Sequence, residues 1–266
     1  MEDNIKSVLK DYLVIDSHIH LGFLASLNMP SASDENIINL LRDFGVKKAI
    51  VSHHGSLSTV GYGDSELFKL LKIYKVFLYG LLVFNPNFEE KSLDLIKKCF
   101  KSENIVGVKI HPSWHMCYPH DARYEKFWDF AEENKIVVLT HSWNPNVPNK
   151  VQRFSDSFLF ESILKKHPKL RLILAHAGGR GEYLYKVIDL LERYTNLYVD
   201  FAGDIFEPGL IKAYVRRVGS ERLLFGTDMP WIDVRYHLIN ILSSNINNKD
   251  KENILGLNSS RLFEIY

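Results

Sequence analysis

Short runs of consecutive apolar residues alternate with segments of helical spacing along almost the whole chain. In the helical segments, apolar residues recur every three or four positions, as at Ile37, Ile38 and Leu41 before Gly45. The pattern predicts helices near 33–44, 64–75, 88–100, 121–134, 154–166 and 181–193. Further helices are predicted between the seventh and eighth apolar runs, after Asp233 and around 259–266. The apolar runs predict eight strands, at 14–20, 48–53, 77–84, 106–111, 136–141, 170–175, 197–201 and 223–226.

The apolar runs are continuous rather than alternating, which indicates strands that are covered on both faces, as in a parallel sheet. Eight strand–helix units in a chain of this length match a TIM (β/α)8 barrel. A doubly wound sheet is the alternative, because periodicity does not reveal whether a sheet closes. No glycine-rich dinucleotide fingerprint follows the first run, which weakens that alternative. No linker-like segment divides the chain, so we expect a single domain over residues 1–266.

The composition narrows the class of function. Hydrophobic residues make up 46% of the chain and charged residues 24%, which indicates a folded core. Lys and Arg number 33 against 32 Asp and Glu, so we expect a small-molecule substrate rather than a nucleic acid or membrane partner. Cys99 and Cys117 do not suggest a disulfide framework, and no signal-like segment is present, so a cytoplasmic location is expected.

Residues with metal-binding or acid–base chemistry stand at the carboxyl ends of the predicted strands. His18 and His20 are two positions apart on the first strand and therefore point to the same side. Later strands end in the other members of the set: Lys109, His111, His141, His176 and Asp228. TIM barrels build their active sites at this end of the strands. The set therefore predicts an active site that holds a metal.

Five short motifs carry a resemblance to the amidohydrolase superfamily. They are Asp16-Ser-His18-Ile-His20, Gly107-Val-Lys109-Ile-His111-Pro112, Thr140-His141, Ala175-His176-Ala-Gly178-Gly179 and Phe225-Gly226-Thr-Asp228-Met-Pro230. More narrowly, the chain resembles the branch that contains aminocarboxymuconate-semialdehyde decarboxylase and related metal-dependent hydrolases. The likeness spans residues 14 to about 263, and the fold it implies agrees with the strand count.

The resemblance implies a set of ligands for one divalent metal: His18, His20, His141 and Asp228. Zn²⁺ suits three imidazoles, one carboxylate and a water, and Mn²⁺, Fe²⁺ or Co²⁺ fit similar ligands. His176 and Asp228 are the expected catalytic residues, which would move protons to and from a metal-activated water. Asp16 is expected to orient the site through a hydrogen bond.

Lys109 decides the type of site. In some relatives a lysine on the fourth strand is carbamylated and bridges two metals, whereas a cationic lysine would hold a substrate carboxylate. We favour one ion, and two remain possible. His111, Trp114 and Arg180 are candidates for substrate contacts, since they fall in loops beside these strand ends.

The expected reaction is hydrolysis of a small amide, lactam or lactone by metal-activated water. The alternative is a lyase, a decarboxylase or hydratase that acts on a small carboxylic acid, because nearly the same residues serve both reactions. A ligand-binding barrel without catalysis ranks below these two. Members of this branch often form dimers, so the resemblance allows a homodimer. Substrate choice would depend on the loops at 21–32, 52–63, 112–120, 142–153 and 202–207.

Overall fold

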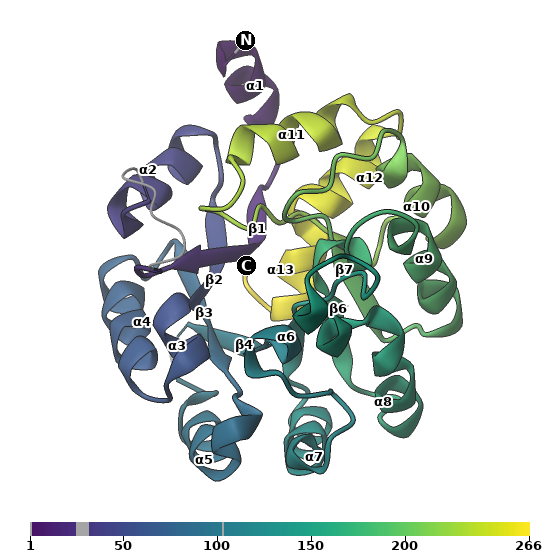
Figure 1. Cartoon of the computed structure of the whole chain (residues 1–266). Coiled ribbons are helices and arrows are strands. Elements are labelled where there is room, and N and C mark those ends of the chain that lie inside the picture. Colours follow the sequence, from purple (N-terminus) through teal and green to yellow (C-terminus); the bar gives the residue numbers. More distant parts are fainter. Residues whose placement is uncertain (1, 25–31, 103) are drawn as a thin grey trace.

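Eight parallel strands in sequential order form a barrel with helices around it (Figure 1). The computed structural model describes residues 2–24, 32–102 and 104–266, so most of the first substrate loop, residues 25–31, lies outside the described residues. The prediction of a single TIM barrel is confirmed. The strands are β1 Ile15–Leu21, β2 Lys48–His53, β3 Leu78–Val83, β4 Ile105–Ile110, β5 Val137–Thr140, β6 Arg171–Leu174, β7 Leu197–Asp200 and β8 Leu223–Leu224.

The segment after β8 closes the barrel against β1. The backbone N–H of Ser17 donates to the carbonyl of Phe225 over 2.9 Å, and that of His20 donates to the carbonyl of Met229 over 2.7 Å. Strand β8 is shorter than the predicted run 223–226. The reason is that the N–H of Phe225 donates to the carbonyl of Ile254 instead of continuing the ladder. Residues 225–229 are thereby held beside β1.

The helices follow the predicted order and surround the strands. Four were not predicted: α1, the short α3 and α6 in the loops after β2 and β4, and the short α12 between α11 and α13. The predicted helix at 154–166 is a pair of 3₁₀ segments followed by one short α-helix. The α-helices are α1 Glu2–Leu9, α2 Asp34–Asp43, α3 His54–Ser58, α4 Tyr62–Ile73, α5 Glu89–Cys99, α6 Pro112–His115, α7 Glu125–Glu133, α8 Glu161–Lys166, α9 Tyr183–Arg193, α10 Leu210–Val218, α11 Val234–Ser243, α12 Asn248–Glu252 and α13 Asn258–Phe263.

The described residues also form 3₁₀ segments and one π-helical turn. A π-helical turn at Asn253–Leu257 joins α12 to α13. The 3₁₀ segments are η1 Pro86–Phe88, η2 Ala122–Tyr124, η3 Lys150–Ser155, η4 Ser157–Phe160 and η5 Ala175–Gly178.

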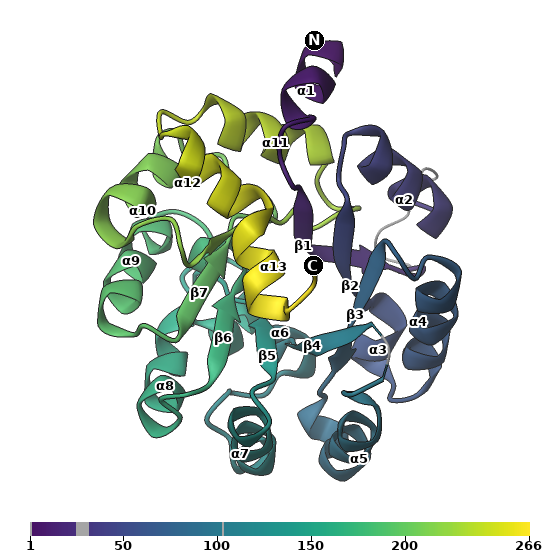
Figure 2. The same cartoon turned by 180° about the vertical axis from the view of Figure 1, so that it is seen from behind.

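One end of the barrel is filled by the C-terminal segment. Leu262, Phe263 and Ile265 pack on the apolar side chains that fill the barrel interior, among them Ile15 and Ile173. Figure 2 shows α13 crossing this end of the barrel. Because the strands begin here, their carboxyl ends face the opposite, open end. The residues at the carboxyl ends of the strands therefore meet at that open end.

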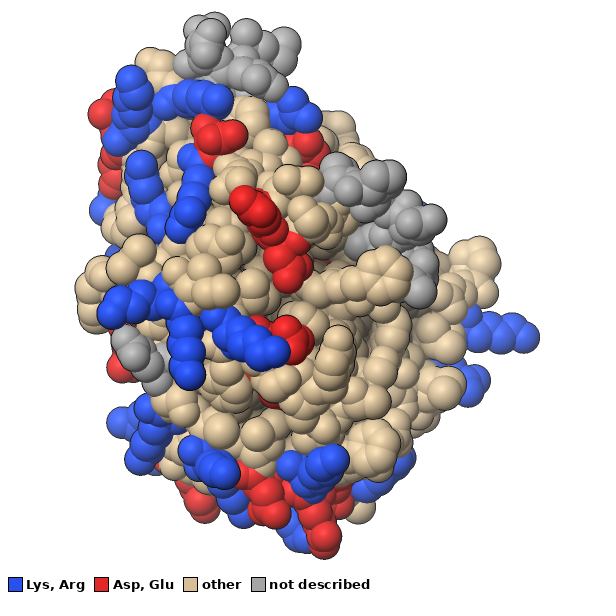
Figure 3. Space-filling model, turned by 90° about the vertical axis from the view of Figure 1, so that its left-hand side faces the viewer, with Lys and Arg blue, Asp and Glu red and all other residues tan. Residues whose placement is uncertain are grey.

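The surface carries charged residues of both signs, and neither cysteine forms a disulfide. Figure 3 shows Lys and Arg side chains along the left and lower edges of one side, with Asp and Glu among them. Cys99 and Cys117 are both free. Within the described ranges, no helix has the length and apolar character needed to cross a membrane.

Candidate metal centre and substrate cavity

His18 and His20 meet at the open end of the barrel, as their spacing on β1 predicts. The two side chains are buried, and their Nε2 atoms lie 3.2 Å apart. Two nitrogens bound to one zinc ion at about 2.0–2.1 Å would lie roughly 3.3 Å apart at a tetrahedral angle. The pair is therefore spaced as two ligands of one ion.

Asp228 brings a carboxylate to the same point. The backbone N–H of Asp228 donates to the carbonyl of His18 over 2.8 Å, and its φ of 64° lies in the left-handed region. Its Oδ1 lies 3.1 Å from His20 Nε2 and 3.5 Å from His18 Nε2. These three residues form a group whose ligand atoms are close enough to hold one metal ion. We call this group the three-ligand cluster.

Asp200, at the end of β7, is a functional residue that the sequence analysis missed. Its Oδ2 accepts a hydrogen bond from His18 Nδ1 over 2.9 Å, and its Oδ1 accepts from the backbone N–H of His176 over 2.8 Å. Since the carboxylate holds the proton of His18 on Nδ1, the lone pair of Nε2 points into the three-ligand cluster. Its position at a strand end was the available signal, but no motif marked it.

The buried imidazoles of the site are neutral near pH 7. Burial, with Lys109 nearby, lowers the pKa of His20 to about 3 and also holds the pKa of His18 well below its ordinary value. Neutral imidazoles offer lone pairs, which a metal ion requires. The chemistry of the donor set therefore fits a divalent metal.

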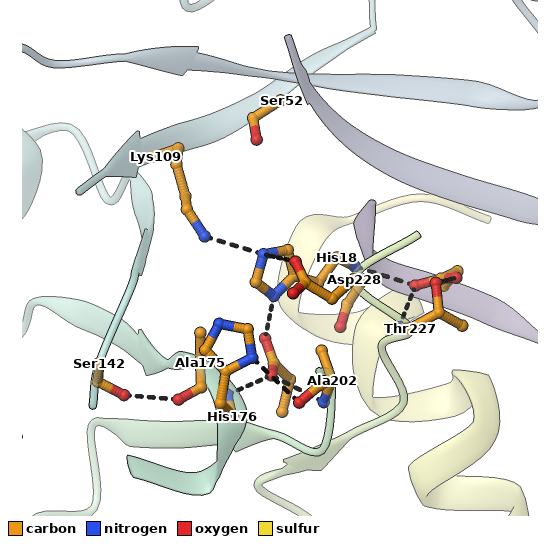
Figure 4. A network of polar contacts seen from close by, with 12 residues as sticks. His18, Ser52, Lys109, Ser142, Ala175, His176, Ala202, Thr227 and Asp228 are labelled. Carbon is orange, nitrogen blue, oxygen red and sulfur yellow. Dashed lines mark hydrogen bonds and ion pairs between the residues drawn. The ribbon is translucent and has the colours of Figure 1, made fainter. Parts of the chain in front are cut away.

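His176 occupies a turn with unusual backbone geometry after β6. Its φ is 60° and that of Ala177 is 45°, a conformation that is uncommon for residues with side chains. Its Nδ1 donates to the carbonyl of Ala202 over 3.0 Å, and its ring centroid lies 5.2 Å from that of His18 (Figure 4). A Cβ on Gly203 would lie 2.6 Å from His176 Nδ1, so only glycine leaves room for this ring.

Lys109 points from β4 toward the three-ligand cluster (Figure 4). Its Nζ lies 2.9 Å from His18 Nε2, and the residue is only 1% exposed. Burial lowers the pKa of this amine to about 8, so at pH 7 it is mainly an ammonium. Among the described residues, no carboxylate forms an ion pair with it.

His141 lies in the same cavity but outside the three-ligand cluster. Its Nε2 lies 3.1 Å from Gln152 Oε1, and its ring stacks on His111 with centroids 4.2 Å apart. Gln152 Oε1 accepts a hydrogen bond from the N–H at Nε2, which leaves Nδ1 as the free acceptor. The structure does not bring this residue within ligand distance of the other three, so its role as the fourth ligand stays a prediction.

The cavity above these residues has a volume of about 430 Å³. His111 and Trp114, two of the expected substrate contacts, line it. Arg180, the third, is exposed and forms an ion pair with Asp204, a residue of the cavity wall. The Arg180 guanidinium also lies 5.7 Å from the Trp143 ring centroid.

Asp16 makes hydrogen bonds to the backbone of the site and to Thr227, and not to the side chain of a metal ligand. Its Oδ1 accepts from the N–H groups of His18 and Thr227, and its Oδ2 accepts from the Thr227 hydroxyl over 2.6 Å. Burial raises the pKa of this carboxyl to about 7. Asp16 thereby ties β1 to the segment that carries Asp228.

Comparison with known proteins places this site in a family. The amidohydrolase family model matches residues 15–265. The chain belongs to the amidohydrolase family. It is 26% identical over 272 residues to the gamma-resorcylate decarboxylase of Rhizobium sp. (strain MTP-10005), which covers 92% of this chain and 70% of the relative. It is 21% identical to the 2-amino-3-carboxymuconate-6-semialdehyde decarboxylase of Caenorhabditis elegans, over 91% of this chain and 61% of that protein.

Solved structures share the fold of this amidohydrolase. The dihydroxybenzoic acid decarboxylase of Polaromonas sp. JS666, solved with manganese and the inhibitor 2-nitroresorcinol, superposes with a TM-score of 0.75 at 15% identity. The match covers 95% of this chain and 97% of that one.

The expectation of a hydrolase is wrong: the curated relatives are decarboxylases, in agreement with the alternative reading. The shared site residues serve both reactions, which is why the sequence motifs favoured the wrong one.

Proposed function

We propose that this amidohydrolase-family enzyme is a metal-dependent decarboxylase of a small hydroxylated aromatic carboxylic acid. In this reaction the bond between the ring carbon and the carboxylate breaks and CO₂ leaves. A proton takes the place of the carboxylate on the ring. Support comes from the decarboxylase relatives and from the charge of the cavity.

The buried ammonium of Lys109 is the observation that carries the proposal. A buried cation without an anionic partner is unfavourable. This ammonium lies beside the three-ligand cluster and lines the substrate cavity. A substrate carboxylate entering the cavity would form an ion pair with this ammonium, and a neutral substrate would not.

The three-ligand cluster would hold one divalent ion, with His141 as the expected fourth ligand. Mn²⁺ is the first candidate, because the Polaromonas relative contains manganese, and Zn²⁺ suits the same imidazole and carboxylate ligands. When bound, such an ion supplies Lewis-acid polarisation of a substrate oxygen.

Asp228 is the residue best placed to deliver the proton. Its Oδ1 faces the two histidines, and Oδ2 makes no ion pair among the described residues. Burial raises the pKa of this carboxyl above its ordinary value. We propose that Oδ2 gives its proton to the ring carbon that bears the carboxylate. The electron pair of the breaking C–C bond then restores the aromatic ring.

His176 is a candidate to hold a proton beside Asp228. Burial lowers its pKa to about 4, so its ring is neutral near pH 7. Its Nδ1 proton is donated to the carbonyl of Ala202, which leaves Nε2 as an acceptor. We propose that His176 Nε2 takes part in returning a proton to Asp228 between turnovers.

The reaction can be tested with 2,6-dihydroxybenzoate labelled with ¹³C in its carboxyl group. Protein loaded with Mn²⁺ should release ¹³CO₂ and resorcinol in equal amounts, and metal-free protein should release neither. A panel of other hydroxybenzoates would cover differences in ring substitution. Absence of ¹³CO₂ from every member with fully loaded protein would refute the proposal.

Replacing Lys109 by Gln should raise KM for the carboxylate substrate by roughly 10- to 100-fold, because a hydrogen bond to a charged group contributes about 1.5–3 kcal/mol. Steady-state kinetics would measure the change in KM. The control is Lys10→Gln, because Lys10 is exposed and does not line the cavity. Metal analysis of the same variant separates two roles. An unchanged metal content supports a cationic Lys109 that binds the substrate carboxylate. A fall from two ions per chain to fewer would instead indicate a carbamylated Lys109 that bridges two metals.

A further inference from the structure

His54 is a buried histidine of the cavity that the proposed reaction does not use. It is the first residue of α3 and follows β2 directly. In the sequence, His54 directly follows the second predicted strand, 48–53. The structure places it in the cavity wall, and only 3% of it is exposed.

The ring of His54 is held in one orientation by its neighbours. It stacks on His20 with centroids 4.8 Å apart and an angle of 12° between the planes. Trp231 approaches it edge-on, with centroids 6.5 Å apart. The Nδ1 atom lies 2.9 Å from the carbonyl oxygen of Gly22.

These contacts also fix the proton of the ring. A carbonyl oxygen only accepts, so Nδ1 must carry the hydrogen. In a neutral imidazole the other ring nitrogen then carries no hydrogen. Nε2 is therefore an acceptor, and it is buried without a hydrogen-bond partner in the structure.

The turn that supplies the carbonyl depends on glycine. Gly22 has a φ of +86°, and a Cβ there would lie 2.3 Å from the ring of His53. Only glycine fits this position, and it keeps the carbonyl oxygen aimed at His54 Nδ1. The acceptor state of Nε2 is thus built into the end of β1.

A buried acceptor without a partner favours a ligand that donates a hydrogen bond. The cavity already contains the ammonium of Lys109 and would hold a divalent ion. A cationic donor would be repelled there, so the suitable donor is neutral, and a hydroxyl of the proposed substrate is such a group.

We propose that His54 Nε2 accepts a hydrogen bond from a ring hydroxyl of the substrate, and that this contact makes the enzyme select hydroxylated rings. The inference rests on the proposed decarboxylase function for the rest of the substrate. His54 is here a specificity-determining residue, and it takes no part in breaking the C–C bond.

The test compares 2,6-dihydroxybenzoate with 2-fluoro-6-hydroxybenzoate, in which fluorine replaces one hydroxyl with little change in size. The variant His54→Phe keeps a flat ring against His20 and loses both nitrogens. Wild-type enzyme should prefer the dihydroxy compound by about 10-fold or more in kcat/KM. In His54→Phe this preference should fall to about 2-fold or less. The exposed His120, changed to Phe, is the control and should keep the wild-type preference.

Binding of product-like compounds supplies a readout that does not need turnover. Resorcinol should bind Mn²⁺-loaded wild type about 10-fold more tightly than it binds His54→Phe, as measured by calorimetry. The compound 1,3-difluorobenzene should bind both proteins equally. Thermal unfolding would confirm that the variant is folded, and His54→Gln, which removes the ring and restores a side-chain acceptor, should recover part of the resorcinol affinity.

Two results would separate this inference from the proposed function. Loss of hydroxyl-dependent binding in His54→Phe, in a protein that releases no CO₂ from any hydroxybenzoate, supports His54 as the hydroxyl acceptor and removes only the decarboxylase proposal. An unchanged hydroxyl preference in an active and folded His54→Phe overturns the role of His54.

Discussion

Mn²⁺ should bind the Asp228→Asn variant at least 100-fold more weakly than it binds the wild type, and CO₂ release should fall by roughly 10³-fold. The substitution removes a carboxylate ligand from the three-ligand cluster and, in the proposed reaction, the group that carries the proton to the ring carbon. Loss of several kcal/mol of electrostatic and proton-transfer stabilisation corresponds to about this change in rate. Isothermal titration and the ¹³CO₂ assay measure the two effects.

His18→Ala provides an independent check, because it removes a ligand without removing the proton donor. It should reduce Mn²⁺ affinity to a similar extent. The surface variant His120→Ala removes an exposed histidine and should leave metal content and rate unchanged. Wild-type Mn²⁺ affinity in both Asp228→Asn and His18→Ala would contradict the three-ligand cluster as the metal site.

Asp200→Asn should weaken metal binding and activity by about 10- to 100-fold, although Asp200 does not belong to the three-ligand cluster. An Asn that keeps its oxygen toward the N–H groups of His176 and Ala202 places its NH₂ against His18 Nδ1. His18 would then take the other tautomer, with the proton on Nε2, where the metal lone pair is needed. Calorimetric Mn²⁺ titration and the pH dependence of that affinity would detect the change.

Asp204→Asn is the matched control for this variant. Asp204 also lines the cavity and carries the same functional group, but its carboxylate pairs with Arg180. It should keep the wild-type Mn²⁺ affinity. Equal loss in both variants would mean that Asp200 acts only through the overall charge of the cavity and not through the His18 proton.

Periodicity and spacing were sufficient to predict the barrel and the convergence of His18, His20 and Asp228. Strand alternation fixes which side chains share a side, and parallel strands bring their carboxyl ends to one face. Asp200 escaped prediction because a lone carboxylate at a strand end carries no spacing signal. The orientation of His141 toward Gln152 depends on a rotamer and a loop contact, which the sequence pattern does not contain.

The reaction itself could not be read from the motifs. Ligand residues that activate a water for hydrolysis also hold a carboxylate for decarboxylation. The charge of Lys109 supports the decarboxylase proposal, and it depends on burial by distant segments. The same is true of His54, whose proton position is set by a carbonyl on the neighbouring strand end.

Helix α13 and Ile265 fill the end of the barrel opposite the cavity, which limits how substrate and products can enter and leave. Among the described residues, apolar side chains fill the barrel interior, so the cavity does not continue through it to the other end. The proposed substrate and products would therefore enter and leave through the open end of the cavity, which Trp114 and Trp231 line. For the proposed reaction, release of the aromatic ring, the larger product, is the step that frees the cavity for the next substrate.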